Sequence, residues 1–228
     1  MIKKPFVFLC TGVSLDGKIS NYKRECSPIS ADDNRDLLYN SRVNADAVMI
    51  GGKTLIHDDS GLTVKSESRQ QQRLKLGKTK EPAKLAIISD ASQIKMGGDF
   101  LSKGDGQKYI FTTQRTSQEI IDLLSKAGCQ CFVYGENKVD LKKVMLKIVD
   151  LGIESVLVEG GGELIFSLIK EKLVDEIYMK LGDLIIGGAD SPTLADGQGF
   201  ELGEFVKTEL LNVERQGNVM ILRYKIIK

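Results

Sequence analysis

Short apolar runs separated by amphipathic segments extend over most of this chain. Phe6–Val13 and Ala47–Ile50 are apolar runs of strand length, and each is followed by polar or glycine residues where a buried strand would end. Strands that recur with helices between them form largely parallel sheets. We therefore expect an α/β protein with a mostly parallel central sheet and helices on both of its faces. The strands expected in this part of the chain are Phe6–Val13, Ala47–Ile50, Leu85–Ser89, Lys108–Thr112, Cys131–Tyr134 and Ser155–Val158.

Helix signals occupy the segments between these strands. Ser30 has the residue type of an N-cap and precedes acidic residues and apolar residues at helical spacing, which predicts a helix ending near Arg42. Glycines close two later amphipathic segments, as is typical where a helix ends in the left-handed conformation. These later helices are expected from Thr116 to Gly128 and over Asp140–Leu151, with another over Glu163–Lys172.

The pattern changes in the last part of the chain. Glu176–Leu181 predicts one more strand. Lys207–Arg215 and Val219–Ile227 predict two long strands joined across Gln216-Gly217-Asn218, which has the composition of a hairpin turn. An antiparallel C-terminal hairpin is therefore expected to complete the sheet.

Composition favours one domain that binds a small molecule. The chain has 228 residues, 42% of them hydrophobic, and its 4 prolines are scattered without forming a linker, so residues 1–228 are expected to form a single domain. The net charge of +1 gives no general attraction to nucleic acid or to a membrane. No apolar stretch has the length of a membrane span, and the N-terminus has no signal cleavage site, so we expect a cytoplasmic protein.

The cysteines and the basic stretch in the middle of the chain carry no functional signal of their own. Cys129-Gln-Cys131 is one residue short of a redox motif, and strand alternation would place both thiols on one face, so packing and reduced thiols are expected, with no metal site. The stretch Arg69–Lys84 is basic but lacks the aromatic residues that stack on bases. It is expected to be a solvated loop or a short surface helix.

The strongest local motif is a glycine turn between an apolar strand and an apolar helix. Ser155–Ser167, SVLVEGGGELIFS, places Gly160-Gly161-Gly162 where backbone N–H groups at a helix start attract phosphate oxygens. A dinucleotide pyrophosphate fits such a turn, and a tight structural turn is the alternative. Glu159 ends the strand, where ligands of open α/β sheets bind, and it either orients a polar substrate or is simply exposed.

Two further turns have both a functional and a structural interpretation. Asp16 and Lys18 flank Gly17 after the first strand, so they either present an acid and a cation to one site or form an ordinary Asp-Gly turn. Gly51-Gly52-Lys53-Thr54 resembles the end of a P-loop, but Ala47 stands where that motif requires glycine. A glycine turn that caps a short helix ending near His57-Asp58-Asp59 is therefore favoured. His57 is the only histidine, which excludes a His-His metal pair.

Arg42 and Lys65 flank this region of the sequence. Both side chains are suited to a substrate phosphate, and solvated surface cations are the alternative interpretation.

These motifs occur together and in a fixed order. GVSLDGK, GGKTLIHDDSGLTV, LAIIS, LVEGGGEL, LVDEI and GGADSPTLADGQGF follow one another along nearly the whole chain. This set resembles the riboflavin-biosynthesis reductase family, whose fold resembles dihydrofolate reductase. The resemblance implies a homodimeric oxidoreductase that uses NADPH to reduce a phosphoribosylamino-pyrimidine, with hydride going to C1′ of the ring-opened imine.

The resemblance also assigns residues. It implies that Lys18 and Glu159 orient the imine and manage its proton, and that Arg42 and Lys65 bind the 5′-phosphate. The residues implied for the NADPH site are Val13, Thr54, Asp58, Ser89 and the run Gly161–Ser167, which begins with Gly161, Gly162, Glu163 and Leu164. Those implied for the substrate site are Ser27, Arg42, Leu62, Lys65 and Glu159.

The sequence departs from the family pattern in places. Ser60 stands where the family commonly has proline, and Leu181-Gly182-Asp183 replaces a usual Ala-Pro. The His-x-Glu and cysteine pair of the zinc deaminase that many members carry are absent. A standalone reductase suits a pathway in which reduction precedes deamination, so 2,5-diamino-6-(ribosylamino)-4(3H)-pyrimidinone 5′-phosphate is the expected substrate.

Several alternatives remain open on the sequence alone. The deaminated uracil compound, 5-amino-6-(5-phosphoribosylamino)uracil, is the first alternative substrate, and a pterin of the dihydrofolate type is another. NADH is an alternative cofactor to NADPH. A non-catalytic module that senses a dinucleotide would keep the same binding residues without turnover.

Overall fold

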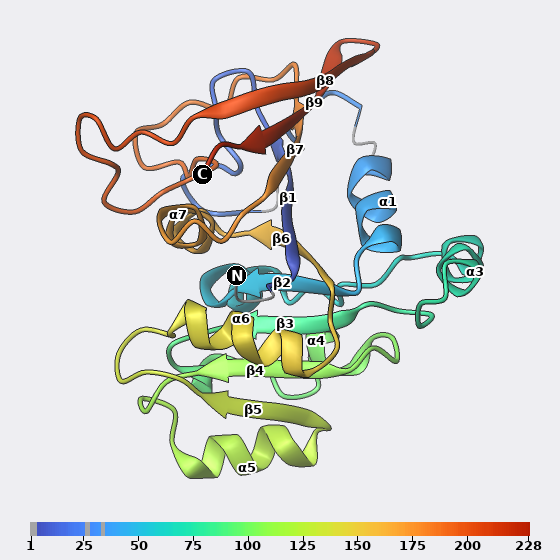
Figure 1. Cartoon of the computed structure of the whole chain (residues 1–228), viewed down its shortest axis with the longest axis vertical. Helices are drawn as coiled ribbons and strands as arrows, with labels where there is room; N and C mark the ends of the chain where they lie inside the picture. Colours follow the sequence, from blue (N-terminus) through green and yellow to red (C-terminus); the bar gives the residue numbers. More distant parts are fainter. Residues whose placement is uncertain (1–3, 26–27, 33–34) are drawn as a thin grey trace. The chain divides into compact units, whose positions relative to one another are not determined.

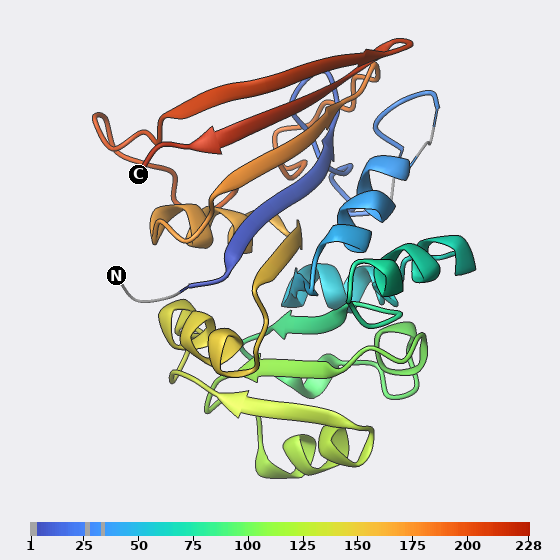
Figure 2. The ribbon, with the colours of Figure 1, turned by 45° about the vertical axis from the view of Figure 1, so that its right-hand side comes forward.

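The computed structural model describes residues 4–25, 28–32 and 35–228. Its strands form a nine-stranded sheet in the order β5-β4-β3-β2-β6-β1-β7-β9-β8 (Figures 1 and 2). The strands are β1 (Phe6–Val13), β2 (Ala47–Gly51), β3 (Ala83–Ile87), β4 (Lys108–Thr112), β5 (Cys129–Val133), β6 (Ser155–Gly160), β7 (Glu176–Leu181), β8 (Thr208–Gln216) and β9 (Val219–Ile226). The helices are α1 (Asp36–Asn44), α2 (Gly52–Asp58), α3 (Glu67–Lys75), α4 (Asp99–Ser102), α5 (Gln118–Lys126), α6 (Leu141–Asp150) and α7 (Gly162–Lys170), with a short 3-10 helix at Ala91–Gln93.

The chain divides into two compact units. The first unit contains Met1–Phe6 and Tyr39–Leu157, and the second contains Val7–Leu38 and Val158–Lys228. No described helix has the length and hydrophobicity needed to cross a membrane.

The first unit is built on consecutive parallel strands. β2 pairs with β3, β3 with β4, and β4 with β5, all in parallel. Every residue of β2 is buried, as expected for a strand covered on both faces. Helix α2 contacts β2 and β3, and α5 packs beside β5 (Figures 1 and 2). Helix α6 begins where the sequence predicts, and the Asp140 side chain caps it by accepting the amide of Lys143.

The second unit combines a parallel and an antiparallel pair. β1 pairs with β7 in parallel, and β7 pairs with β9 in the antiparallel direction. β8 and β9 form a long hairpin whose turn contains Gly217 at a φ of 60° (Figures 1 and 2). The predictions of a mostly parallel α/β sheet and of an antiparallel C-terminal hairpin are thus confirmed.

The predicted helix start at Ser30 is wrong. Helix α1 begins at Asp36, and the Ser30 hydroxyl donates to the carbonyl of Asp32. The Lys180 ammonium donates to the same carbonyl at 3.0 Å, and the amide of Ala31 donates to Asp183 at 2.9 Å. These contacts with β7 and the loop that follows it hold the segment in a non-helical conformation.

The stretch Arg69–Lys84 contains the predicted short surface helix, but it is not solvated throughout. It forms helix α3 and the start of β3, and Arg73 and Lys84 within it are fully buried. Strand β3 therefore begins earlier than the apolar run predicted, since Lys84 occupies a buried strand position. A charged side chain is buried at tolerable cost only where hydrogen bonds satisfy it.

Lys84 shows how this burial is achieved. Its ammonium donates to the carbonyl of Phe100 at 2.8 Å and to the carbonyl of Lys103, and it lies 5.7 Å from the centre of the Phe100 ring. These contacts fix the end of α4 against β3. Desolvation, together with repulsion from Lys108, lowers the pKa of Lys84 to about 8.

This lowered pKa makes stability depend on pH. The folded protein releases the Lys84 proton near pH 8, whereas the unfolded chain holds it up to about 10.5. The free energy of unfolding of the wild type should therefore rise, relative to Lys84→Met, as pH increases through this window, because the unfolded state then binds more protons. Urea unfolding of both proteins at either end of the window measures this difference. An unchanged difference would contradict the prediction.

Candidate functional site

The glycine turn has the predicted strand–turn–helix geometry. β6 ends at Gly160, whose φ is 139°, and α7 begins at Gly162. The peptide between Gly160 and Gly161 is cis. Gly161 is the N-cap in an extended conformation and supplies no side chain to cap the first turn of α7. Backbone N–H groups at such an uncapped helix start are suited to an anionic group.

Gly162 also has a packing reason to be glycine. A Cβ atom at this position would lie 2.6 Å from a carboxylate oxygen of Asp196 and 2.8 Å from the carbonyl of Thr193. The amide of Asp196 donates to the Gly162 carbonyl at 3.1 Å. The Asp196 carboxylate in turn accepts the amide and the hydroxyl of Thr193, both at 2.9 Å. The loop 193–196 is therefore packed directly on the start of α7.

Lys18 contacts the same loop from the turn after β1. Lys18 forms an isolated antiparallel bridge with Thr193, and its ammonium donates to the carbonyl of Ser191 at 3.2 Å. Ser14 closes the turn, because its amide donates to the Lys18 carbonyl at 2.8 Å and its hydroxyl accepts the Lys18 amide at 2.9 Å. The second unit thus brings Lys18 and Gly162 to one loop. Val13 ends β1, directly before Ser14.

Asp16 has a structural role in this turn. Its carboxylate accepts the Ser14 hydroxyl at 2.6 Å and the amides of Ile186 and Gly187 at 3.0 and 2.7 Å. These hydrogen bonds, led by that from Ser14, lower the pKa of Asp16 to about 2. The ordinary-turn interpretation therefore fits Asp16 better than an acid that exchanges protons with a substrate.

The other second-unit residues lie as follows. Glu159 is half-buried near the end of β6. Ser27 lies outside the described residues. Gly182 explains one departure from the family pattern, because a Cβ there would lie 1.8 Å from the carbonyl of Ile29. Only glycine fits this approach.

In the first unit, Arg42 is buried and fixed. Only 3% of its surface is exposed, and its Nη1 donates to the carbonyl of Thr63 at 2.6 Å. Its guanidinium lies 5.5 Å from the centre of the Tyr39 ring, with Arg69 5.0 Å from the same ring. The solvated-surface alternative is therefore wrong for Arg42.

The segment that Arg42 contacts has an unusual backbone. Leu62 and Lys65 have φ angles of 49° and 66°, in the left-handed region that non-glycine residues rarely adopt. Leu62 is fully buried, whereas the Lys65 side chain is exposed. Backbone strain of this kind clusters at functional sites. The structure therefore brings three predicted substrate residues, Arg42, Leu62 and Lys65, to one strained segment.

The remaining predicted cofactor residues follow β2 and β3 along the chain. Thr54 and Asp58 are on α2, which follows β2, and Ser89 follows β3. Gly52 allows the close approach of α2, since a Cβ there would lie 2.7 Å from the Ile88 side chain. The glycine turn capping a short helix is confirmed here, with Asp59 in the left-handed conformation at its C-cap. This edge of a parallel sheet is where ligands bind in α/β folds.

The cysteines and potential metal ligands show no competing chemistry. Burial raises the pKa of Cys129 to about 11 and also raises that of Cys131, which keeps both thiols protonated and unreactive. Across residues 4–25, 28–32 and 35–228, no group of three or more His, Cys, Asp or Glu side chains is arranged to hold a metal ion.

Sequence reasoning missed several residues that support the site. Arg73 and Glu81 lie buried behind Arg42 and the segment 62–65, and Asp196 and Thr193 support the glycine turn. Nothing in the sequence indicated Arg73 and Glu81, because they lie in a stretch whose composition is typical of a solvated loop.

Known proteins match this chain over most of its length. The RibD C-terminal domain model matches residues 5–222. A protein of Archaeoglobus fulgidus named 2,5-diamino-6-ribosylamino-4(3H)-pyrimidinone 5′-phosphate reductase is 34% identical over 214 residues, which cover 94% of each chain. A protein of Aquifex aeolicus with the same name is 26% identical over 231 residues, covering 99% of this chain and 98% of the relative.

Solved structures share the fold. A pyrimidine reductase-like protein of Corynebacterium diphtheriae superposes with a TM-score of 0.84 at 19% identity, covering 100% of this chain and 94% of the other. Dihydrofolate reductase of Enterococcus faecalis, solved with NADP(H), gives a TM-score of 0.51 at 8% identity over 98% and 97% of the two chains. The dihydrofolate-reductase-like fold implied by the sequence resemblance is confirmed. The chain belongs to the RibD C-terminal domain family.

Proposed function

We propose that this protein reduces 2,5-diamino-6-ribosylamino-4(3H)-pyrimidinone 5′-phosphate to its ribitylamino product in riboflavin biosynthesis. The observation that carries this proposal is the similarity, along 94% of both chains, to the Archaeoglobus fulgidus reductase of that name. Relatives from Aquifex aeolicus and Methanothermobacter thermautotrophicus carry the same name and also align over almost their whole length. We propose that residues 1–228 act as one reductase domain.

The glycine turn of the second unit is suited to the phosphates of a nicotinamide dinucleotide. Gly161 leaves the first turn of α7 without a side-chain cap, which supports binding of the cofactor phosphates there by backbone N–H groups. Bound NADPH, with NADH as the alternative, would supply the hydride for C1′ of the ring-opened imine. In this proposal Gly161, Gly162, Glu163 and Leu164 hold the cofactor together with Val13, Thr54, Asp58 and Ser89.

Arg42 and Lys65 are proposed to bind the substrate 5′-phosphate. The Arg42 guanidinium donates to the carbonyl of Thr63, two residues before Lys65, so it is anchored to the segment that carries Lys65. Leu62 is fully buried in the same segment, so in this proposal it supports the substrate site by packing beneath it. A planar guanidinium and an ammonium together are suited to a phosphate dianion.

Lys18 and Glu159 are proposed to orient the reacting imine. The Lys18 ammonium is held by the Ser191 carbonyl, so its position does not depend on the substrate. Glu159 would hydrogen-bond the polar pyrimidine and, with Lys18, manage the proton that accompanies the hydride. Hydride transfer depends mainly on proximity, so positioning is the principal task of both side chains.

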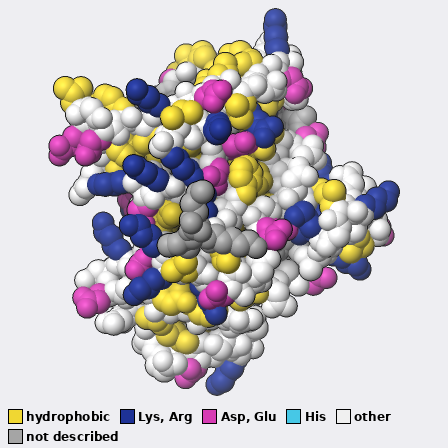
Figure 3. Space-filling view, viewed as in Figure 1, with side chains coloured by type: hydrophobic (Ala, Val, Ile, Leu, Met, Phe, Trp, Pro, Cys, Tyr) yellow, Lys and Arg dark blue, Asp and Glu magenta, His cyan; other side chains and the backbone are white. Residues whose placement is uncertain are grey.

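A homodimer in the cytoplasm completes the proposal. The free thiols of Cys10, Cys129 and Cys131 are compatible with a reducing compartment. For the dimer, β8 ends the strand order of the sheet and is exposed along its whole length. Leu211 and Val213 on it are 42% and 51% exposed, and Figure 3 shows hydrophobic side chains gathered over the hairpin at the top of the view. An edge of this kind is a template for strand pairing.

The sequence of β8 favours pairing with a second copy of itself. Counted in residues, antiparallel pairing centred on Asn212 would place Glu209 opposite Arg215 of the other copy and Leu211 opposite Val213, with Leu211 at a bulge of β8. Opposite charges and apolar pairs facing each other across strands both stabilise a sheet.

Turnover assays test the proposed reaction directly. The purified protein, mixed with NADPH and the diaminopyrimidinone ribosylamino phosphate, should consume NADPH absorbance. The deaminated uracil compound and a dihydropterin, tested in parallel, should be consumed more slowly, and NADH in place of NADPH gives the cofactor preference. Tight NADPH binding without oxidation in the presence of any of these substrates would instead indicate a sensing module.

Removing the Arg42 side chain tests the phosphate site. Arg42→Ala should raise KM for the phosphorylated substrate by about 10- to 100-fold, since a hydrogen bond to a charged group contributes about 1.5–3 kcal/mol. The KM for a dihydropterin, which lacks the ribose phosphate, should change little if it is turned over. Lys75→Ala, which removes an exposed cation from α3, is the matched control and should leave KM unchanged. An unchanged KM in Arg42→Ala would exclude Arg42 from the phosphate site.

Charge exchange on β8 tests the dimer. Light scattering should show twice the chain mass for the wild type and a monomer for Glu209→Arg, which places like charges opposite each other. Adding Arg215→Glu to this variant should restore the dimer. Leu202→Lys, at a residue 93% exposed before β8, is the control and should remain dimeric. A dimeric Glu209→Arg protein would contradict this interface.

A further inference from the structure

We propose that Arg73 and Glu81 are positioning residues that hold the phosphate-binding side chains Arg42 and Lys65 in place. This inference rests on the proposed function of Arg42 and Lys65 as ligands of the substrate phosphate. It adds a buried pair of opposite charges that the substrate does not touch.

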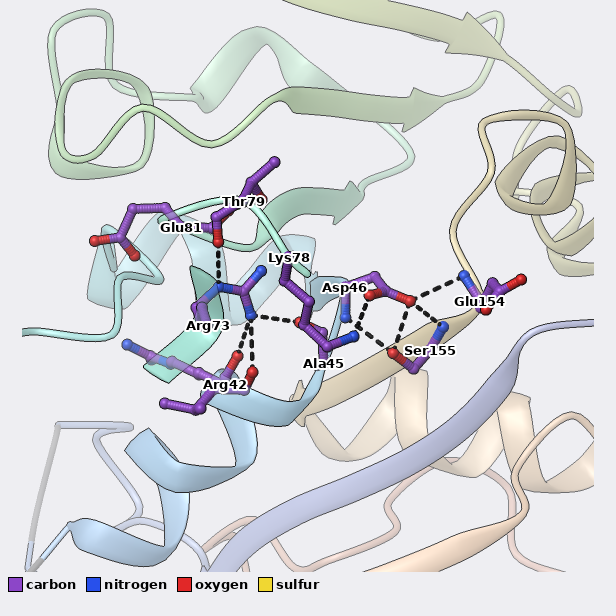
Figure 4. A network of polar contacts seen from close by, with 10 residues as sticks. Arg42, Ala45, Asp46, Arg73, Lys78, Thr79, Glu81, Glu154 and Ser155 are labelled. Atoms are coloured by element: carbon purple, nitrogen blue, oxygen red, sulfur yellow. Dashed lines mark hydrogen bonds and ion pairs between the residues drawn. The ribbon is translucent and has the colours of Figure 1, made fainter. Parts of the chain in front are cut away.

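Arg73 fixes the end of α1 (Figure 4). Its Nη1 donates to the carbonyls of Arg42, Val43 and Ala45 at 2.7, 3.2 and 2.6 Å. Its Nε donates to the carbonyl of Thr79 at 2.8 Å. A cation at a helix C-terminus satisfies carbonyls that have no partner within the helix and interacts favourably with the helix dipole. Arg73 therefore determines where the backbone of Arg42 lies.

Arg42 is consequently held at both ends. Its carbonyl accepts from Arg73, and its own guanidinium donates to the Thr63 carbonyl. A long side chain restrained in this way loses little conformational entropy when it binds a phosphate.

Glu81 performs the matching task for the segment that carries Lys65. It is 3% exposed, and its carboxylate accepts the amide of Val64 at 2.9 Å and the Gln70 side chain at 2.8 Å. Val64 lies between Thr63 and Lys65, next to the left-handed residues Leu62 and Lys65. A strained backbone persists only where its surroundings hold it, and Glu81 supplies this restraint.

Fold stability alone accounts poorly for this pair. Burying charged side chains is costly, and buried charges can often be replaced by apolar residues without loss of stability. Nη2 of Arg73 is buried and has no hydrogen-bond partner among the described residues, which adds to the cost. The bonds that the pair makes to backbone include those to Arg42 and Val64, which carry or adjoin the phosphate-binding side chains. Accurate placement of those cations explains why such a pair is present.

Arg73→Lys and Glu81→Gln, each measured with the phosphorylated substrate and its unphosphorylated riboside, test this inference. Lysine lacks the planar guanidinium with which Arg73 reaches several carbonyls, and glutamine lacks the negative charge of Glu81. Each variant should raise KM for the phosphorylated substrate about tenfold and change kcat less than about twofold, with the riboside unaffected. In the double variant Arg42→Ala/Arg73→Lys, KM should equal that of Arg42→Ala, because Arg73 acts through Arg42.

A destabilised control separates positioning from folding. Val144→Ala creates a cavity beneath the buried face of helix α6 and should lower the melting temperature while leaving KM unchanged. Equal KM changes with and without the phosphate, or additive effects with Arg42→Ala, would overturn the positioning role. If Arg73→Lys does not fold, an unchanged KM in Glu81→Gln is sufficient to overturn the positioning role. A wild type that reduces no phosphorylated pyrimidine would instead refute the proposed function, and with it this role.

Discussion

The loops of this protein depend on charged side chains that satisfy polar groups of the main chain. Irregular backbone cannot satisfy its own N–H and C=O groups, so other partners must do so. Arg73 serves the end of α1, Lys84 the end of α4, and Asp16 the amides of residues 186 and 187. Asp46 similarly accepts the amides of Glu154 and Ser155 while it pairs with Lys78 (Figure 4). Each of these charged side chains therefore holds a loop or a helix end in place.

This use of charge has a consequence for the site. The cations proposed to meet the substrate phosphate stand on backbone that other charges already hold, so binding need not order it. Much of the restraint is expensive in stability, because buried charges and left-handed residues such as Leu62 both carry an energetic cost. Functional sites commonly contain such destabilising features, since accurate placement of side chains matters more there than a further gain in folding stability.

Sequence patterns predicted the bounds of strands and helices well where the buried residues are apolar and the exposed residues are polar. β1, β4 and β7 begin and end at the predicted residues, because apolar residues predominate in each and a polar residue or glycine follows it. β3 was predicted two residues late because Lys84 lies inside it. α1 was predicted early because Ser30 has the residue type of an N-cap, whereas its hydroxyl donates to the carbonyl of Asp32. In both cases a residue distant in sequence reversed the local preference.

The sequence by itself determined the alternation of strands and helices, the C-terminal hairpin, the glycine turn and the family. These follow from periodicity and residue type, which are local properties of the chain. Only the tertiary structure decided that Arg42 is buried and held, that Asp16 is an anchor, and that Gly162 faces the loop 193–196. The physical reason is that these roles depend on partners far along the chain. Arg73 and Arg42 are 31 residues apart, and no local pattern encodes their contact.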